Sequence, residues 1–143
     1  MSHQPFRLGK ALGYACLLWM TSFVWGSIVF MLPATRNLAS IPYVARNPAL
    51  SFPLLLIWLV LTFLLAKSYL GQAQDKVAEG LKLGLVFFIV NVVLNHLVLV
   101  LLLKNGMSFY LSLSLWLAYL LLVTVPWLTG RSLQTGAARV ERT

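Results

Sequence analysis

The sequence predicts an all-α fold, a bundle of four transmembrane helices, and three observations support this prediction. Of the 143 residues, 60% are hydrophobic and 10% are charged, against roughly 45–50% and about 25% in soluble domains. The apolar residues gather into four runs of about 20, which as helices cross a hydrocarbon core of roughly 30 Å. The alternating segments of a membrane barrel are absent, so each run must satisfy its backbone hydrogen bonds within a helix.

The four runs lie in one membrane domain, residues 1–143, with helices expected at about residues 11–32, 50–70, 81–103 and 107–128. Prolines in the first connection, residues 33–49, fix the backbone and predict a semi-rigid outer loop. The connection of Lys104, Asn105 and Gly106 is short, which predicts that the third and fourth helices form an antiparallel hairpin.

The ends of two helices carry further signals. Residues from Gln72 to Lys82 predict that the third helix begins before the membrane, because a Glu79–Lys82 pair at this spacing supports a helix. Pro126 predicts a kink or an early end of the fourth helix. Gly130 and Gly136 then predict that the basic tail, residues 131–143, is mobile and attracted to anionic headgroups.

The distribution of basic residues predicts the orientation, because cytoplasmic loops carry an excess of Lys and Arg. The N-terminal arm, the second connection and the tail together hold most of the 11 basic residues: Arg7, Lys10, Lys67, Lys76, Lys82, Arg131, Arg139 and Arg142. The first and third connections hold only Arg36, Arg46 and Lys104. We therefore expect both termini in the cytoplasm and an integral protein of a prokaryotic cytoplasmic (inner) membrane.

The third helix carries a stripe of small and amide side chains. At about 100° per residue, Gly80, Gly84, Asn91 and Asn95 fall within one arc of the helix surface. Glycines four residues apart allow a second helix to approach closely, and asparagine amides hydrogen-bond across such interfaces. The stripe predicts helix packing, within the bundle or between copies, and leaves open a ligand site built from Asn91 and Asn95.

His96 lies next to this stripe near the middle of the membrane. A neutral imidazole there is able to ligate a haem iron or a chlorophyll magnesium, and it is equally able to serve as a hydrogen-bonded packing residue. The sequence leaves both readings open, with packing as the first. We expect no metal site otherwise, because the ligand spacings of metal centres are absent.

Other polar groups also lie at membrane depth. Trp19, Trp58, Trp116 and Tyr119 are deep enough that their N–H or O–H groups need partners, or else face a bound lipid or another subunit. The first helix presents Gly9, Gly13, Cys16 and Ser27 on one face and Ser22 with Gly26 on another. Two neighbours are therefore able to approach it closely, which makes it a candidate central helix. Cys16 is the only cysteine and is read as a packing residue.

The segment Glu79-Gly80-Leu81-Lys82-Leu83-Gly84-Leu85, with Asn91 and Asn95 downstream, resembles a set of uncharacterised small four-helix membrane proteins of bacteria and archaea. In them the third helix opens with an E-G-x-x-x-G pattern followed by an asparagine and then an aspartate. Asn95 stands where that aspartate is usual, so this chain departs from the pattern at the one titratable position. The resemblance implies the fold and no activity.

These observations favour a non-enzymatic membrane subunit or scaffold that packs in a larger complex or with itself. No charged residue lies in the middle of a span, which argues against proton-coupled antiport. The first alternative is a small transporter or channel for a neutral or hydrophobic solute, with Asn91, Asn95, His96 and Tyr119 lining its path. The second is haem or chlorophyll binding through His96. The basic residues are scattered, so nucleic acid is not an expected partner.

Overall fold

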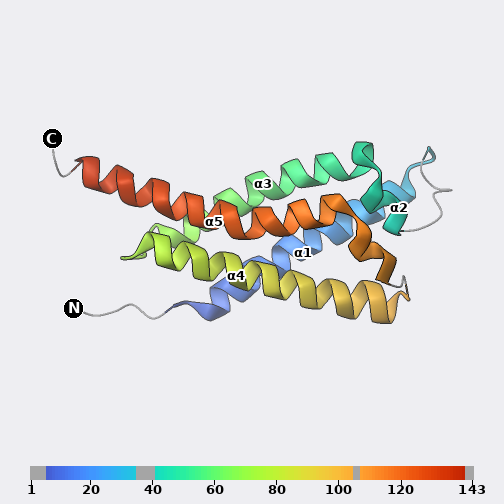
Figure 1. The fold of residues 1–143 in the computed structure, drawn as a ribbon, viewed down its shortest axis with the longest axis horizontal. Helices are drawn as coiled ribbons and strands as arrows, with labels where there is room; N and C mark the ends of the chain where they lie inside the picture. Colours follow the sequence, from blue (N-terminus) through green and yellow to red (C-terminus); the bar gives the residue numbers. More distant parts are fainter. Residues whose placement is uncertain (1–5, 35–40, 105–106, 141–143) are drawn as a thin grey trace.

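The computed structural model describes residues 6–34, 41–104 and 107–140, with the side chains of 41–43 and 137–140 left out. Over these residues the protein is helical, without strands, and four of its helices are long and apolar enough to cross a membrane. They form an elongated bundle in which α1 begins and α5 ends near the connection between α3 and α4 (Figure 1). The protein is therefore an integral membrane protein by fold class.

The elements follow one another along the chain with short connections. The four long helices are α1 (Leu8–Met31), α3 (Pro48–Leu70), α4 (Lys76–Leu94) and α5 (Leu113–Val140). A short helix, α2 (Ile41–Arg46), precedes α3. The segment η1 (Asn95–Leu102) continues α4 as a π-helix, and η2 (Met107–Leu111) is one 3₁₀ segment before α5.

Local chemistry fixes where α3 and α4 begin. α3 has Pro48 at its first position, where a missing N–H costs nothing, and the Asn47 side chain accepts a hydrogen bond from the Ala49 N–H at 3.1 Å. Asp75 caps α4 in the same way, accepting from the Ala78 N–H at 3.0 Å. α4 thus begins before the apolar run does, as the sequence predicts.

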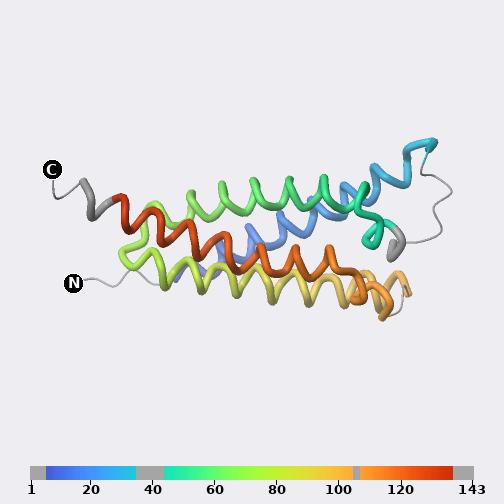
Figure 2. Tube along the Cα trace, turned by 45° about the horizontal axis from the view of Figure 1, so that its top comes forward, coloured from blue at the N-terminus to red at the C-terminus, as the bar shows by residue number. Residues whose placement is uncertain are grey.

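The packing pairs the helices in a ring. α5 packs along α4 and along α3, and α1 packs on α4 and α3 from the other side (Figures 1 and 2). The expectation that the first helix is central is wrong. Within its most apolar window α1 is only 17% buried, as is the α4 span, whereas α5 is 44% buried. The glycines of α1 meet no neighbour, whereas Gly130 of α5 lies against the backbone at the start of α4.

The fourth helix differs from its expected bounds at both ends. Residues 107–111 form η2 rather than the first turn of α5, because Ser112 turns inward and its hydroxyl donates to the Ala45 carbonyl at 2.7 Å. α5 then continues through Pro126 and Gly130 to Val140, where a mobile tail was expected. The Gln134 side chain accepts a hydrogen bond from the Val77 N–H at 3.3 Å, which attaches this extension to the start of α4.

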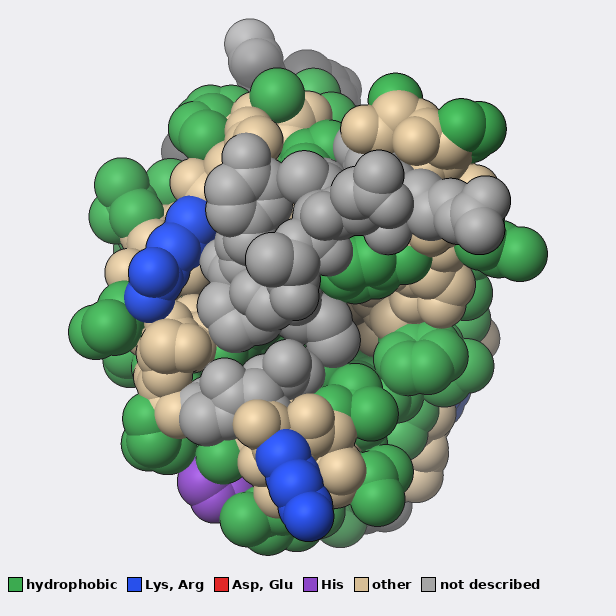
Figure 3. All heavy atoms as spheres, turned by 90° about the vertical axis from the view of Figure 1, so that its right-hand side faces the viewer, with side chains coloured by type: hydrophobic (Ala, Val, Ile, Leu, Met, Phe, Trp, Pro, Cys, Tyr) green, Lys and Arg blue, Asp and Glu red, His purple; other side chains and the backbone are tan. Residues whose placement is uncertain are grey.

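The outer loop and the third connection are described in part. Residues 35–40 and 105–106 lie outside the described ranges, so the predicted semi-rigid loop and tight turn are not fully covered. Figure 3 looks at this end of the bundle, where isolated basic side chains lie among hydrophobic ones. Exposed hydrophobic residues continue along the long helices, as a bilayer requires.

Candidate functional site

Three helices meet at a hydrogen-bonded network in the apolar interior. The Asn95 side chain accepts a hydrogen bond from the Trp19 indole N–H at 2.9 Å and donates from its amide nitrogen to the Tyr119 hydroxyl at 2.9 Å. Tyr119 is 2% exposed and also packs edge-on against the Phe88 ring, with centroids 5.4 Å apart. The network links α1, η1 and α5 where bulk water cannot compete.

Asn91, one turn before Asn95, is fully buried. Its amide nitrogen donates to the Ala15 carbonyl of α1 at 3.3 Å and to the Phe87 carbonyl of its own helix at 2.9 Å. The Asn91 side-chain oxygen has no hydrogen-bond partner. The structure therefore brings Asn91 and Asn95 together on the inner face of α4 and η1, where both are engaged in contacts between helices.

Gly80 and Gly84 hold the contact between α4 and α5. A Cβ atom at Gly80 would lie 2.5 Å from the Pro126 carbonyl oxygen, and one at Gly84 would lie 2.8 Å from that of Val123. A Cβ at Gly130 of α5 would overlap the Lys76 carbonyl in turn. Glycines of each helix thus lie directly against the backbone of the other. Small residues commonly allow such close approach between membrane helices.

His96 lies apart from the network. It is half-buried, and its ring lies 6.4 Å from that of Tyr110 on η2. Among the described residues no group of three or more His, Cys, Asp or Glu is placed to hold a metal ion.

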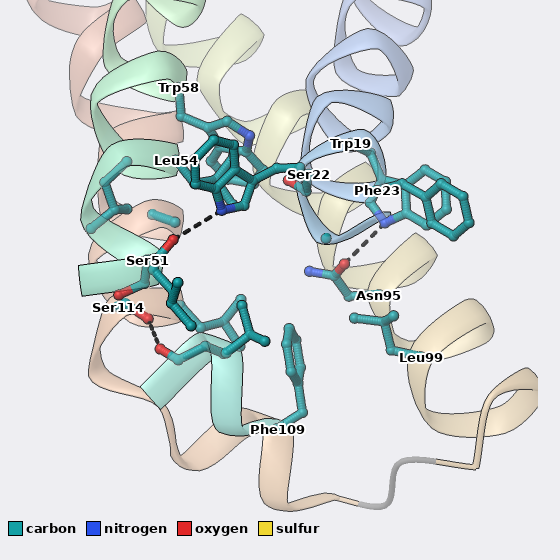
Figure 4. Close-up of a pocket in the computed structure, with 18 of the residues that line it drawn as sticks. Trp19, Ser22, Phe23, Ser51, Leu54, Trp58, Asn95, Leu99, Phe109 and Ser114 are labelled. Carbon is teal, nitrogen blue, oxygen red and sulfur yellow. Dashed lines mark hydrogen bonds between the residues drawn. The ribbon is translucent and has the colours of Figure 1, made fainter. Parts of the chain in front are cut away.

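A cavity of about 380 Å³ lies between α1, α3, η1 and the elements at the outer-loop end (Figure 4). Its size falls within the roughly 300–1,000 Å³ of small-molecule sites. It is lined mainly by aromatic and aliphatic side chains, and none of its lining residues is charged. The aromatic members are Trp19, Phe23, Trp25, Phe30, Trp58 and Phe109. His96 and Asn91 are not among the lining residues, whereas Asn95 is.

The short helix α2 forms the end wall of this cavity. The hydroxyls of Ser112 and Ser114 both donate to the Ala45 carbonyl, and the Arg46 guanidinium donates to the Ser108 carbonyl at 3.0 Å. The indole N–H of Trp25 donates to the Leu50 carbonyl at 2.9 Å, which attaches α1 to the start of α3. Hydrogen bonds therefore attach α2 to η2 and to the start of α5, and α3 to α1, at this end of the cavity.

Two buried polar atoms at the cavity wall have no hydrogen-bond partner, the indole nitrogen of Trp58 and the hydroxyl of Ser22. In Figure 4 the Trp58 ring reaches from α3 toward α1, where the Ser22 hydroxyl points back toward it. The depth of Trp58 was visible in the sequence, and the pattern of α1 placed Ser22 with Gly26 on one face, but as a packing surface rather than as the wall of a cavity.

The fold and this interior define the class of protein: a four-span helical membrane protein with a closed polar network and an apolar cavity. No protein-family model, curated protein or solved structure matches the chain. Its function is therefore argued from its own residues.

Proposed function

We propose that the protein is a non-enzymatic integral membrane subunit that associates with a further transmembrane helix, from a second copy or from another subunit, through one face of α1. The observation that supports this is a contrast between two sets of glycines. The glycines of α4 lie against the α5 backbone, whereas a Cβ atom at Gly9 or Gly13 would meet nothing within 4 Å.

Gly9 and Gly13 belong to an exposed strip along α1, which we call the seam. At about 100° per residue, Gly9, Gly13, Cys16 and Met20 lie within one narrow arc, and all four are exposed. Small residues spaced four apart drive helix association in lipid by letting backbones approach, and here that surface is unused inside the monomer. The seam of Gly9, Gly13, Cys16 and Met20 is thus available to a partner helix.

The proposed topology places both termini and the α3–α4 connection in the cytoplasm, with α4 and α5 as an antiparallel hairpin. The excess of Lys and Arg at that end supports this orientation. We propose the cytoplasmic membrane of a prokaryote as the location.

The alternatives gain less support. Transport along Asn91, Asn95 and His96 would need these groups to face one path, but Asn91 and Asn95 are occupied within the bundle and His96 lies beside Tyr110. Tetrapyrrole ligation would need a large cavity beside the imidazole, and His96 does not line the cavity described above. We therefore propose neither a haem nor a chlorophyll.

The test is the mass of the protein, extracted through a tag in a mild detergent, by native mass analysis. The wild-type protein should appear with a second copy or a defined partner, and the Gly9→Leu/Gly13→Leu variant should appear as a monomer. Val93→Leu, which adds bulk to a 47% exposed position on α4, is the matched control and should leave the association intact. A monomeric wild-type protein, or an unchanged complex in the double variant, would contradict the proposal.

A further inference from the structure

The cavity between α1 and α3 has the chemistry of a binding site for a molecule dissolved in the membrane. Its wall is apolar and aromatic, and no lining residue carries a charge. A charged ligand would lose its hydration there without compensation, so the occupant must be neutral. The aromatic rings offer faces and edges to a flat or unsaturated group.

The polar atoms of the cavity wall that have no hydrogen-bond partner indicate which chemical group the ligand carries. Trp58 is 3% exposed and its indole N–H is a donor only, so it requires an acceptor. In the apolar interior an unpaired donor is costly, which is why buried indoles normally have partners. The other two tryptophans of the cavity follow that rule, since Trp19 donates to Asn95 and Trp25 to the Leu50 carbonyl.

Ser22 repeats this exception on the facing helix. Thr21 and Ser27, its neighbours on α1, each donate to the carbonyl four residues earlier at 2.9 Å, the usual solution for a hydroxyl in a membrane helix. The Ser22 hydroxyl makes no such bond and is buried facing Trp58 (Figure 4). Two polar groups from different helices, an indole N–H and a hydroxyl, thus line the same cavity without a hydrogen-bond partner.

We propose that this cavity binds a neutral membrane-soluble molecule whose carbonyl oxygen accepts hydrogen bonds from Trp58 and Ser22. The carbonyl oxygen of a quinone and that of an ester lipid share this chemistry. The proposal does not depend on association through α1, because the seam and the cavity use different residues of that helix.

The test uses quenching of tryptophan fluorescence in the purified protein in detergent, because Trp19, Trp25 and Trp58 line the cavity. Titration with decylubiquinone should give saturable quenching. Dioctanoylglycerol should compete if the natural source is an ester lipid and fail to compete if it is a quinone. Decylbenzene, which lacks a carbonyl, should not compete. Absence of saturable binding by either carbonyl compound, or equal competition by decylbenzene, would overturn the proposal.

Variants locate the site. Gly26 lines the cavity and a Cβ atom there meets nothing within 4 Å, so Gly26→Leu should fill the cavity without straining the backbone and abolish saturable quenching. Gly136→Leu makes the same change on α5, outside the cavity and away from the α1 seam, and should leave binding unchanged. Unaltered binding in the Gly26→Leu variant would show that the ligand does not bind in this cavity.

Two further variants test the donors. Ser22→Ala and Trp58→Phe should each weaken binding by about two- to tenfold, the range expected for one neutral hydrogen bond. Trp127→Phe removes an indole outside the cavity and is the control for the loss of a fluorophore. Full affinity in both donor variants would show that the carbonyl is not held by these groups.

Discussion

At the scale of single residues, the interior separates polar groups that are paired from polar groups that are not. Asn95 serves as acceptor for Trp19 and donor for Tyr119, and so satisfies two aromatic side chains from two other helices. Trp58 and Ser22 lie at the wall of the neighbouring cavity without partners. The paired groups around Asn95 stabilise the bundle. The unpaired groups at the cavity wall lower its stability until a ligand supplies the acceptor.

The Asn95–Tyr119 hydrogen bond should show a measurable coupling energy. In a double-mutant cycle of Asn95→Ala and Tyr119→Phe we expect about 0.5–1.5 kcal/mol, since such bonds average about 0.6 kcal/mol and reach about 1.7 kcal/mol in membrane proteins. The measurement is reversible unfolding in mixed micelles of dodecyl maltoside and sodium dodecyl sulfate. Strictly additive single variants would show that the contact carries no energy.

Two of the three cavity tryptophans, Trp19 and Trp58, should differ in how much their replacement by phenylalanine lowers the free energy of unfolding. Trp19→Phe leaves the Asn95 oxygen without its donor and should lower the free energy of unfolding by about 1–3 kcal/mol. Trp58→Phe removes a donor that has no partner. The free energy of unfolding of the ligand-free protein should therefore change by less than about 1 kcal/mol, because removing the unpaired N–H offsets the lost packing. The same micelle unfolding experiment compares them, and equal losses would contradict this assignment.

At the scale of helices, close packing is concentrated where α4 meets α5. Gly80 and Gly84 lie against the α5 carbonyls around Pro126, and Gly130 lies against the start of α4. α5 remains helical through Pro126, and its neighbour contacts this stretch through backbone rather than side chains. The contact extends past the apolar run because Gln134 accepts from the Val77 N–H. These contacts make α5 the most buried of the four spans.

Alanine substitutions should destabilise the protein at one glycine and leave it unchanged or more stable at another. Gly80→Ala places a Cβ atom 2.5 Å from the Pro126 carbonyl oxygen and should destabilise the protein by about 1–3 kcal/mol through overpacking. Gly136→Ala meets nothing within 4 Å and should be neutral or stabilising by up to about 1 kcal/mol, the ordinary helix preference for alanine. Thermal inactivation in detergent measures both, and a tolerated Gly80→Ala would contradict the direct backbone contact.

At the scale of the whole molecule, the bundle has two chemically different ends. The end with the α3–α4 connection carries most of the basic residues, and the other carries α2 and the cavity (Figures 1 and 4). The proposed orientation therefore places the cavity in the outer half of the membrane, away from the cytoplasm. A carbonyl-bearing ligand would enter it from the lipid phase, because the lining is apolar.

The orientation is testable with two cysteines in a Cys16→Ser background. Met107→Cys is at the outer end, where the native side chain is 63% exposed, and Gln74→Cys is in the exposed α3–α4 connection. In intact cells a membrane-impermeant maleimide should label the first and leave the second unlabelled until the cells are opened. The reverse pattern would invert the topology.

The sequence by itself determined the class of the protein. Apolar runs of this length have only one solution in lipid, so the four helices and their membrane setting follow from composition and spacing. The inward direction of Asn91 and Asn95 was also predictable, because amides in a membrane helix must avoid lipid.

Only the tertiary structure decided which surfaces are used. Periodicity shows that glycines of α1 and of α4 each form a stripe, but not that the α4 stripe meets α5 while Gly9 and Gly13 meet nothing. The pairing of Asn95 with Trp19 and Tyr119, and the cavity beside them, join residues far apart in the chain. Helix formation is a local response to lipid, whereas these contacts depend on how four finished helices fit together.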